Sequence, residues 1–297
     1  MVSSEKVMRT LILWAFCVAL AVPRMVIGQE QTSRIGDLAG RSHVGKEIFD
    51  RYCFGCHGPR GDGNGIEAIW IQPFSATGQG STVVKDAPRD FIPAVFKCRS
   101  TPTGTLPTDQ DIFDAITRGF YTTYMPAWKA LPENQRADLV AYIKTFSPRW
   151  KTEKPGTPIQ IPPEPPLTIE SILHGREIFN QVQCWKCHGP EGRGNGPSAL
   201  TLTDDSGFPI RPYDFSSGER FKCGSTNKDL YRIFMTGLDG TPMPSFADNI
   251  QPADAWDLVH FLRTLQLAIK TPESALFQQW KAAHPGQLKP IGTGGGE

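Results

Sequence analysis

Two pentapeptides of the form Cys-x-x-Cys-His constrain this chain more than any other feature of its sequence. They occupy residues 53–57 (CFGCH) and 184–188 (CWKCH), and each is followed by Gly-Pro and a glycine-rich run. Two cysteines three residues apart lie on one side of a single helical turn, and the histidine that follows lies beside that turn. The chain must therefore bring two thiols and an imidazole together at two separate points.

The paired cysteines of such a motif can add to the two vinyl groups at one edge of a haem, and the histidine can then ligate the iron. A redox dithiol or half of a zinc site also contains paired cysteines, but neither requires a histidine directly after the second one. The motifs therefore predict two covalently bound haem c groups. The predicted attachment residues are Cys53, Cys56, Cys184 and Cys187, and the predicted proximal iron ligands are His57 and His188.

The two halves of the chain resemble each other well beyond these motifs. The matched segments are 45–49 with 175–179, 90–91 with 214–215, 96–98 with 221–223, 111–113 with 229–231, and 138–140 with 257–259. Similarity in the same order over such a length indicates one domain that has been duplicated.

Each half is expected to contain three helices, of which the first leads into the CxxCH motif. The second ends at a glycine in each half, and the third has one apolar face. A short helix is expected near the C-terminus as well. The predicted ranges are roughly 108–118 and 227–236 for the second helix, 133–146 and 252–265 for the third, and 273–283 for the last.

This order of helices and motifs resembles that of the class I c-type cytochromes, over residues 43–147 and 174–265. The resemblance implies an all-α fold made of two tandem class I cytochrome c domains related by internal duplication. The expected divisions are a signal peptide at 1–28, cytochrome c domain 1 at 29–147, a proline-rich linker at 148–166, cytochrome c domain 2 at 167–270 and a C-terminal tail at 271–297.

A c-type haem iron commonly has a methionine as its second protein ligand. Met125 and Met243 each lie six residues after a glycine that ends a predicted helix, and a proline follows each of them. Class I cytochromes carry the distal ligand in such a loop, so the resemblance implies iron ligation by Met125 and Met243. Ligation by a second histidine is the alternative. The remaining histidines are interpreted as surface or capping residues: His43, His174, His260 and His284.

Cys98 and Cys223 occupy one position of the repeat, outside the haem motifs. They could be buried apolar residues, a disulfide joining the two domains, or haem ligands. Equivalent positions can meet where two halves pack about a pseudo-two-fold axis, and an even pair in an exported protein favours pairing. The disulfide is therefore slightly favoured over free thiols, and haem ligation is the least favoured because both methionines are well placed.

The N-terminal segment has the pattern of a secretory signal. Lys6 and Arg9 precede a run of twelve apolar residues at 11–22, and small residues follow near Gly28. Such a run is too short to span a bilayer comfortably, although an uncleaved anchor is the alternative. We expect cleavage near Gly28, a periplasmic mature protein and no transmembrane segment in the mature chain.

Charge argues against one class of partner. The chain has 31 basic and 30 acidic residues and shows no basic stripe, so a nucleic-acid partner is not expected. Two irons with predicted histidine and methionine ligands leave no open position for a substrate. We therefore expect a protein that carries single electrons rather than an enzyme, either as a soluble carrier or as an electron-transfer subunit of an oxidoreductase complex.

The partner is suggested only by resemblance. Residues 139–150 and 221–246 are similar to segments of di-haem cytochromes associated with respiratory molybdenum oxidoreductases. This implies redox protein partners, with a molybdenum oxidoreductase or a membrane respiratory complex as candidates. The alternative function is that of a di-haem redox enzyme of the peroxidase or thiosulfate dehydrogenase type.

Overall fold

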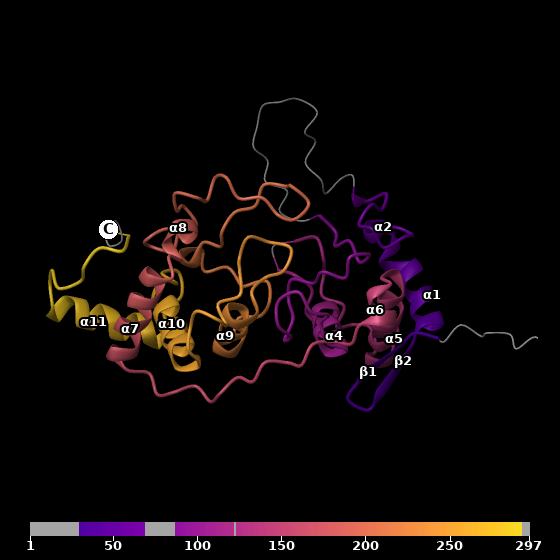
Figure 1. Cartoon of the computed structure of the whole chain (residues 1–297), viewed down its shortest axis with the longest axis horizontal. Helices are drawn as coiled ribbons and strands as arrows, with labels where there is room; N and C mark the ends of the chain where they lie inside the picture. The colour runs from indigo at the N-terminus through magenta and orange to yellow at the C-terminus, as the bar shows by residue number, and fades with distance from the viewer. Residues whose placement is uncertain (1–29, 69–86, 122, 293–297) are drawn as a thin grey trace, which may run out of the picture. The chain divides into compact units, whose positions relative to one another are not determined.

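The computed structural model describes residues 30–68, 87–121 and 123–292, and residues 31–297 form one compact unit. The predicted signal peptide and residues 293–297 of the tail lie outside the described residues. Helices dominate what is described, so the predicted all-α fold is confirmed (Figure 1). A small antiparallel hairpin and two short 3-10 helices complete the secondary structure of the described ranges.

The helices follow the order expected from the sequence, and the predicted helices are confirmed to within a few residues. The first half contains β1 (Thr32–Ile35), β2 (Leu38–Arg41), α1 (Ser42–Tyr52), α2 (Phe54–His57), α4 (Asp109–Arg118), α5 (Glu133–Ile143) and η1 (Lys144–Phe146). After α6 (Arg149–Thr152), the second half contains α7 (Ile169–Gln181), α8 (Trp185–His188), η2 (Phe215–Ser217), α9 (Asn227–Thr236), α10 (Pro252–Thr264) and α11 (Pro272–Ala283).

A close helix crossing organises each half. In the first half α1 packs on α5, and in the second α7 packs on α10 (Figure 1). A Cβ atom added to Gly45 would lie 2.0 Å from the carbonyl oxygen of Asp138, and one added to Gly175 would lie 1.9 Å from that of Asp257. No side chain fits at such a distance, so the glycine present in both halves allows the backbones to approach this closely.

Each crossing is surrounded by its own hydrophobic core. Phe49, Leu139 and Val140 are almost fully buried in the first half, as are Phe179 and Leu258 in the second. The apolar face predicted for the third helix of each half therefore faces a core. Burying one such side chain stabilises a fold by about 1.5–3 kcal/mol.

The helices before the two methionine loops begin and end in the same way. Thr108 and Thr226 each form a capping box with the aspartate three residues later, which satisfies amide groups of the first turn. Both helices end at a glycine with positive φ, 65° at Gly119 and 68° at Gly237. These ends fix where each methionine loop leaves its helix.

The β1–β2 hairpin was not predicted from the sequence. Ser33 lies in β1, and its hydroxyl donates to the carbonyl of Ala137 in α5 over 2.7 Å, so the hairpin covers the outer side of α5. The strands are joined by Gly36-Asp37, and Gly36 has a φ of 55°. A two-residue turn that begins with glycine is a recognised hairpin signal, so the information was present in the sequence.

The predicted linker at 148–166 begins with the short helix α6, whose Trp150 is buried in the first core. Beyond it, the Gly156 amide donates to the carbonyl of Leu106 over 3.1 Å, and the Ile159 amide donates to that of Ser100 over 2.9 Å. Ile159 also packs against the second core. The linker therefore contacts both halves along its length.

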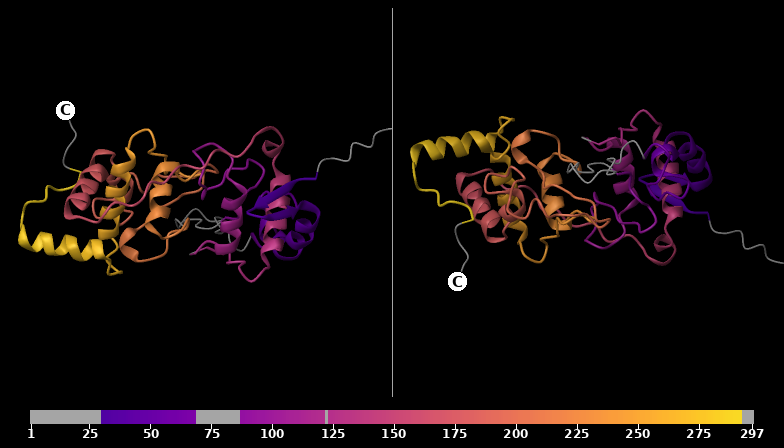
Figure 2. Two further views of the ribbon diagram at one scale, coloured as in Figure 1. Left: turned by 90° about the horizontal axis from the view of Figure 1, so that it is seen from below. Right: turned by 90° about the horizontal axis from the view of Figure 1, so that it is seen from above.

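The predicted C-terminal helix is confirmed as α11, which packs on α7 and α10 through the buried Phe277 (Figure 2). After α11 the chain returns to the CxxCH region of the second half. The amide of Gly292 donates to the side-chain oxygen of Asn180 over 2.8 Å, and a Cβ on Gly292 would lie 3.3 Å from the ring of Trp185.

Candidate haem sites

Each CxxCH motif forms one helical turn, α2 or α8, directly after the first helix of its half. The turn is closed by the histidine amide, which donates to the carbonyl of the first cysteine over 2.9 Å in both motifs. The four motif cysteines are free thiols of intermediate exposure: Cys53, Cys56, Cys184 and Cys187. The spacing thus places both thiols and the imidazole of each motif on a single turn, as the sequence predicts.

The glycine-rich run after each motif folds back over the turn. Amides of this run donate to the carbonyls of the histidine and the second cysteine over 2.8–3.1 Å in both halves. A Cβ on Gly65 would lie 2.0 Å from the carbonyl oxygen of Gly55, and one on Gly196 would lie 2.3 Å from that of Lys186. Glycine is therefore required where the run crosses the motif.

The two histidines are oriented by a backbone carbonyl. Nδ1 of His57 lies 3.1 Å from the oxygen of Arg89, and Nδ1 of His188 lies 3.0 Å from that of Tyr213. A carbonyl only accepts hydrogen bonds, so the hydrogen is assigned to Nδ1 and the lone pair of Nε2 is left for a metal. Metal-ligating histidines usually have such a partner, which fixes the tautomer and the orientation of the ring.

An aromatic ring packs on each imidazole. The ring centroids of His57 and Phe91 are 4.6 Å apart, and those of His188 and Phe215 are 4.9 Å apart. Burial lowers the pKa of His57 to about 4 and lowers the pKa of His188 as well. Both imidazoles are therefore neutral near pH 7, which is the form that binds a metal.

Burial also governs the motif thiols in the haem-free chain. It raises the pKa of Cys53 and that of Cys184 to about 12, and it raises the pKa values of Cys56 and Cys187. Thiols of this kind are protonated at neutral pH and react slowly.

The loops that carry the two methionines have the same internal hydrogen bonds. The carbonyls of Met125 and Met243 each accept from the residue after the helix-ending glycine over 3.0 Å. Their amides each face a threonine hydroxyl, Thr123 at 3.1 Å and Thr241 at 3.2 Å. The common length predicted from the sequence therefore corresponds to a common backbone conformation.

In the second half the predicted ligands line one cavity of about 1540 Å³. Cys184, Cys187 and His188 contribute from α8, and Met243 contributes from the methionine loop. Apolar side chains from α9 and the loops cover much of the remaining wall, including Phe215, Phe221, Leu230, Ile233, Phe234 and Phe246. These residues fit a haem, because thiols, an imidazole and a thioether surround a largely apolar space. A bound haem c would supply an iron that takes up and releases one electron.

Comparisons with known proteins agree with this geometry. Residues 172–266 match the family model for cytochrome c, and residues 41–143 match that for cytochrome C oxidase, cbb3-type, subunit III. A chain of the Kuenenia stuttgartiensis reducing HAO-like protein complex is 40% identical, with 75% of this chain and 95% of that chain covered and a TM-score of 0.68. No curated protein sequence matches the chain.

The chain belongs to the di-haem class I c-type cytochromes. Its cytochrome c domains indicate a role in electron transfer, and its cofactor is covalently bound haem c. None of the helices in the described ranges has the length and apolarity that crossing a bilayer requires.

Cys98 and Cys223 are joined by a disulfide in the structure of this cytochrome, with Cα atoms 5.2 Å apart. The neighbouring Lys97 and Lys222 both line the cavity of the second half, as do Pro88 and Arg89 from the first half. Residues of both halves therefore line the candidate haem cavity of the second half.

The other histidines of the cytochrome do not all follow the prediction. His260 was expected at the surface or at a cap, but its side chain is only 1% exposed. Its Nδ1 lies 2.8 Å from the hydroxyl of Ser171, and its Nε2 lies 3.4 Å from the carboxylate of Glu164. Two polar partners allow this ring to be buried on the core-facing side of α10. His284 caps the end of α11, and His43 is exposed, as predicted.

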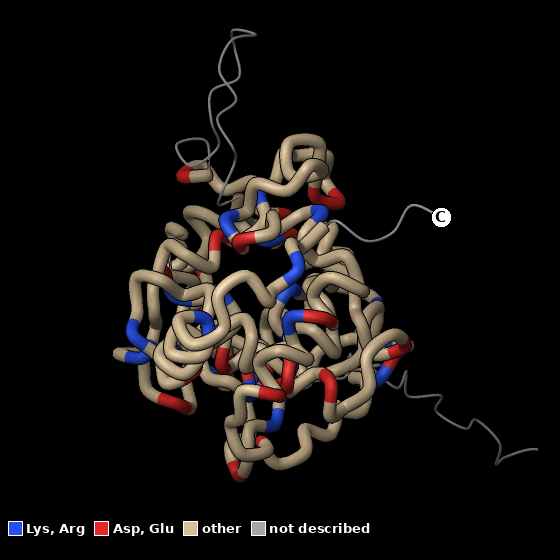
Figure 3. The backbone as a smooth tube through the Cα atoms, turned by 90° about the vertical axis from the view of Figure 1, so that its left-hand side faces the viewer, with Lys and Arg blue, Asp and Glu red and all other residues tan. Residues whose placement is uncertain are grey.

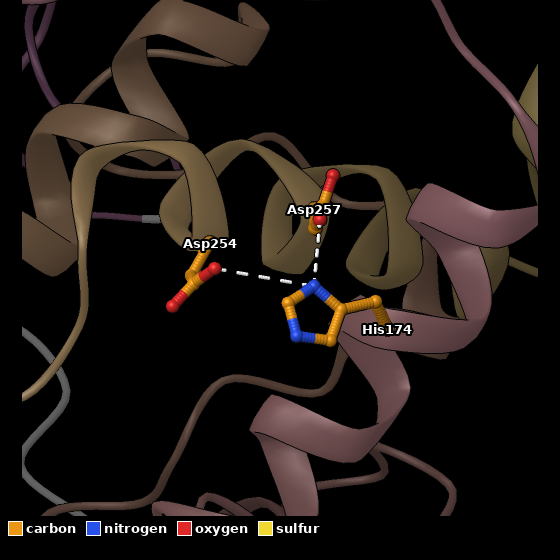
Figure 4. Close-up of side chains that lie close together, drawn as sticks. All are labelled: His174, Asp254 and Asp257. Atoms are coloured by element: carbon orange, nitrogen blue, oxygen red, sulfur yellow. Dashed lines mark hydrogen bonds and ion pairs between the residues drawn. The ribbon is translucent and has the colours of Figure 1, made fainter.

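His174 is a surface residue, as predicted, and it lies beside two aspartates of α10 (Figure 4). Its Nδ1 is 2.8 Å from Asp257 and 3.9 Å from Asp254. The hydrogen bond that His174 donates to the carboxylate of Asp257 raises the pKa of His174. The group has the composition of a weak metal site, but its geometry is explained by an ion pair across the α7–α10 crossing.

Charges of both signs are interspersed on the face of the cytochrome drawn in Figure 3.

Sequence reasoning missed the residues that orient the imidazoles. Arg89 and Tyr213 act through their carbonyls, which every residue type possesses, so their identity carried no signal. The repeat nevertheless contained a signal at these positions, because each residue directly precedes the Asp-Phe pair that recurs at 90–91 and 214–215.

Proposed function

We propose that this cytochrome is exported to the periplasm, binds two haem c groups and carries single electrons as a subunit of an oxidoreductase complex. The haems would be attached through Cys53 and Cys56 and through Cys184 and Cys187. The axial ligands of the irons would be His57 with Met125 and His188 with Met243. The observation that carries the proposal is the match between the two sites, in which each imidazole faces a backbone carbonyl and each methionine lies in a loop with the same hydrogen bonds.

The protein groups have distinct tasks in this proposal. The carbonyls of Arg89 and Tyr213 hold the imidazoles and increase their basicity through Nδ1. The thioethers of Met125 and Met243 raise the reduction potential relative to a second histidine. Because a histidine and a methionine would hold each iron, no position would be left for a substrate, and the bound haem would supply one-electron transfer only.

Export is supported by two independent features. The leader at 1–28 has the charge and apolar pattern of a signal peptide, and a structural disulfide such as Cys98–Cys223 is typical of an oxidising compartment. The divisions at 29–147, 148–166, 167–270 and 271–297 remain the proposed domain organisation.

A subunit role is favoured over that of a free carrier because the similar Kuenenia stuttgartiensis chain comes from a reducing HAO-like protein complex. We propose that the partner is another redox protein of the same complex. A molybdenum oxidoreductase or a membrane respiratory complex is the narrower proposal from sequence resemblance.

The intact mass of protein matured in a host that attaches haem tests the cofactor assignment. The mass should exceed that of the chain without its signal peptide by two haems. The Cys184→Ala/Cys187→Ala variant should lose one haem, whereas the matched Cys98→Ala/Cys223→Ala control should keep both. A wild-type mass with one haem or none would contradict the proposal.

Activity measurements on the same sample test the assigned function. Artificial donors and acceptors should reduce and reoxidise both haems rapidly. Turnover of hydrogen peroxide or thiosulfate at about 1–1,000 per second, the usual range for enzymes, would favour the di-haem enzyme instead. Co-purification of native protein with its bound partners would identify the complex.

A further inference from the structure

The loop that carries Met243 is held by residues of the other domain. Asp239 lies in this loop, four residues before Met243. Its carboxylate accepts hydrogen bonds from the guanidinium of Arg99 over 2.7 Å, the hydroxyl of Thr103 over 2.6 Å and the amide of Gly104 over 2.9 Å. All three donors come from one short segment of the first half, directly after Cys98.

Arg99 also contacts the helix from which the loop departs. Its side chain is 0% exposed, and Nη2 donates to the carbonyl of Thr236 over 2.6 Å. Thr236 is the last residue of α9, where the carbonyls of a helix carry partial negative charge. A single buried cation therefore binds both the end of α9 and the loop that follows it. We call Arg99 and Asp239 the interdomain clamp.

The first half has different residues at the corresponding positions. Aligned on the helix-ending glycines, Tyr121 corresponds to Asp239, and aligned on the disulfide cysteines, Gly224 corresponds to Arg99. Tyr121 is 57% exposed, and the guanidinium of Arg220 lies 5.8 Å from the centre of its ring. The loop of Met125 is therefore held at this position by an exposed aromatic contact instead of a buried ion pair.

We propose that Arg99 and Asp239 are positioning residues for the second haem, because they keep the Met243 loop closed over its iron. This inference rests on the proposed ligation by Met243. Hydrogen bonds to buried charged groups are stronger than neutral ones, and removing one partner leaves the other charge buried and uncompensated. The Met243 loop therefore cannot open without breaking its contacts to Arg99, which belongs to the other domain, and this raises the free energy of opening.

Imidazole binding to the oxidised holoprotein measures how often this loop opens. Imidazole can replace a methionine ligand only when the loop moves away, so its apparent affinity increases with the open population. Asp239→Asn should bind imidazole about 10- to 100-fold more tightly at the second haem, the range expected for losing a charged hydrogen-bond partner. Binding at the first haem should not change.

Three further variants make the result interpretable. Met243→Ala identifies the second haem, because it should bind imidazole tightly without loop opening. Thr103→Ala removes one neutral donor at an exposed residue and should tighten binding about two- to tenfold without leaving a buried charge. Asp50→Asn breaks an exposed ion pair with Lys46 in α1 and should change nothing.

The outcomes separate the clamp from the ligand assignment. If Met243→Ala leaves imidazole binding unchanged, Met243 is not the ligand and the proposed ligand set fails. If Met243→Ala tightens binding but Asp239→Asn and Thr103→Ala match the wild type, the clamp is overturned. If Asp239→Asn cannot be isolated with both haems, the test rests on Thr103→Ala. An imidazole affinity of Thr103→Ala equal to that of the wild type would then overturn the inference.

Discussion

Replacing both Cys98 and Cys223 by alanine should destabilise the cytochrome substantially. The disulfide joins residues separated by 125 positions. In the chain-entropy model, releasing a loop of this length from the unfolded state lowers the free energy of unfolding by about 5 kcal/mol. For a chain of this size, such a loss corresponds to a fall in Tm of about 10–20 °C. Alanine is preferred to serine because Cys223 is buried and a hydroxyl there would add a cost of its own.

Denaturant unfolding of the holoprotein without reductant measures this loss. Haem absorbance and far-ultraviolet circular dichroism should be followed together, because transitions that do not coincide would show that the domains unfold separately. Reductant should lower the stability of the wild type towards that of the variant and leave the variant unchanged. Alkylation under denaturing, non-reducing conditions should label neither Cys98 nor Cys223 in the wild type.

A loss of less than about 1 kcal/mol in the variant, well below the usual contribution of a disulfide, would refute the argument from loop closure. Labelling of both thiols in the wild type would show instead that the bond does not form. Labelling therefore tests whether the bond exists, and the unfolding measurement then tests how much an existing bond contributes to stability.

Met125→His and Met243→His should each abolish the methionine-to-iron charge-transfer band of one haem and lower its reduction potential. A double variant that keeps both bands would show that other residues ligate the irons. Gly175→Ala should destabilise the protein by about 1–3 kcal/mol or more, because its Cβ would lie 1.9 Å from the carbonyl oxygen of Asp257. Glu177→Ala, an exposed substitution in the same helix, should be nearly neutral. Equal free energies of unfolding for the two variants would contradict the packing argument. Because the pKa of His174 is raised from 6.5 by Asp257, this pair contributes stability that is present below pH 6.5 and lost as the pH rises through the raised value. His174→Gln should remove this small pH dependence, and denaturant titrations with identical pH profiles for wild type and variant would count against it.

The sequence predicted the elements that repeat and the side chains whose chemistry is distinctive. The CxxCH turns, the helices that end at Gly119 and Gly237 and the two methionine loops all carry a local signal that appears twice. Agreement between the two copies made each interpretation more secure than a single motif would allow.

What the sequence did not predict depends on contacts between distant residues. Arg99 and Asp239 are 140 positions apart and have no counterpart in the other half, so neither local pattern nor repetition marked them. His260 was assigned to the surface by residue type, whereas its burial depends on Glu164 and Ser171, which only the folded chain brings to it. The β1–β2 hairpin is a different case, because its Gly36-Asp37 turn carried a local signal that was overlooked.

The disulfide also changes what the proline-rich linker is needed for. Cys98 precedes residues 148–166 and Cys223 follows them, so the linker lies inside the covalent loop that the disulfide closes. A protease that cuts the linker once would leave two polypeptides still covalently joined, which would separate on a gel only after reduction. The interdomain clamp would likewise remain, since Arg99 and Asp239 lie on opposite sides of the cut. In the finished protein the linker is therefore not the connection that holds the halves together. The linker contributes during folding, before the disulfide forms, because it keeps Cys98 and Cys223 on one chain and raises their effective concentration relative to each other.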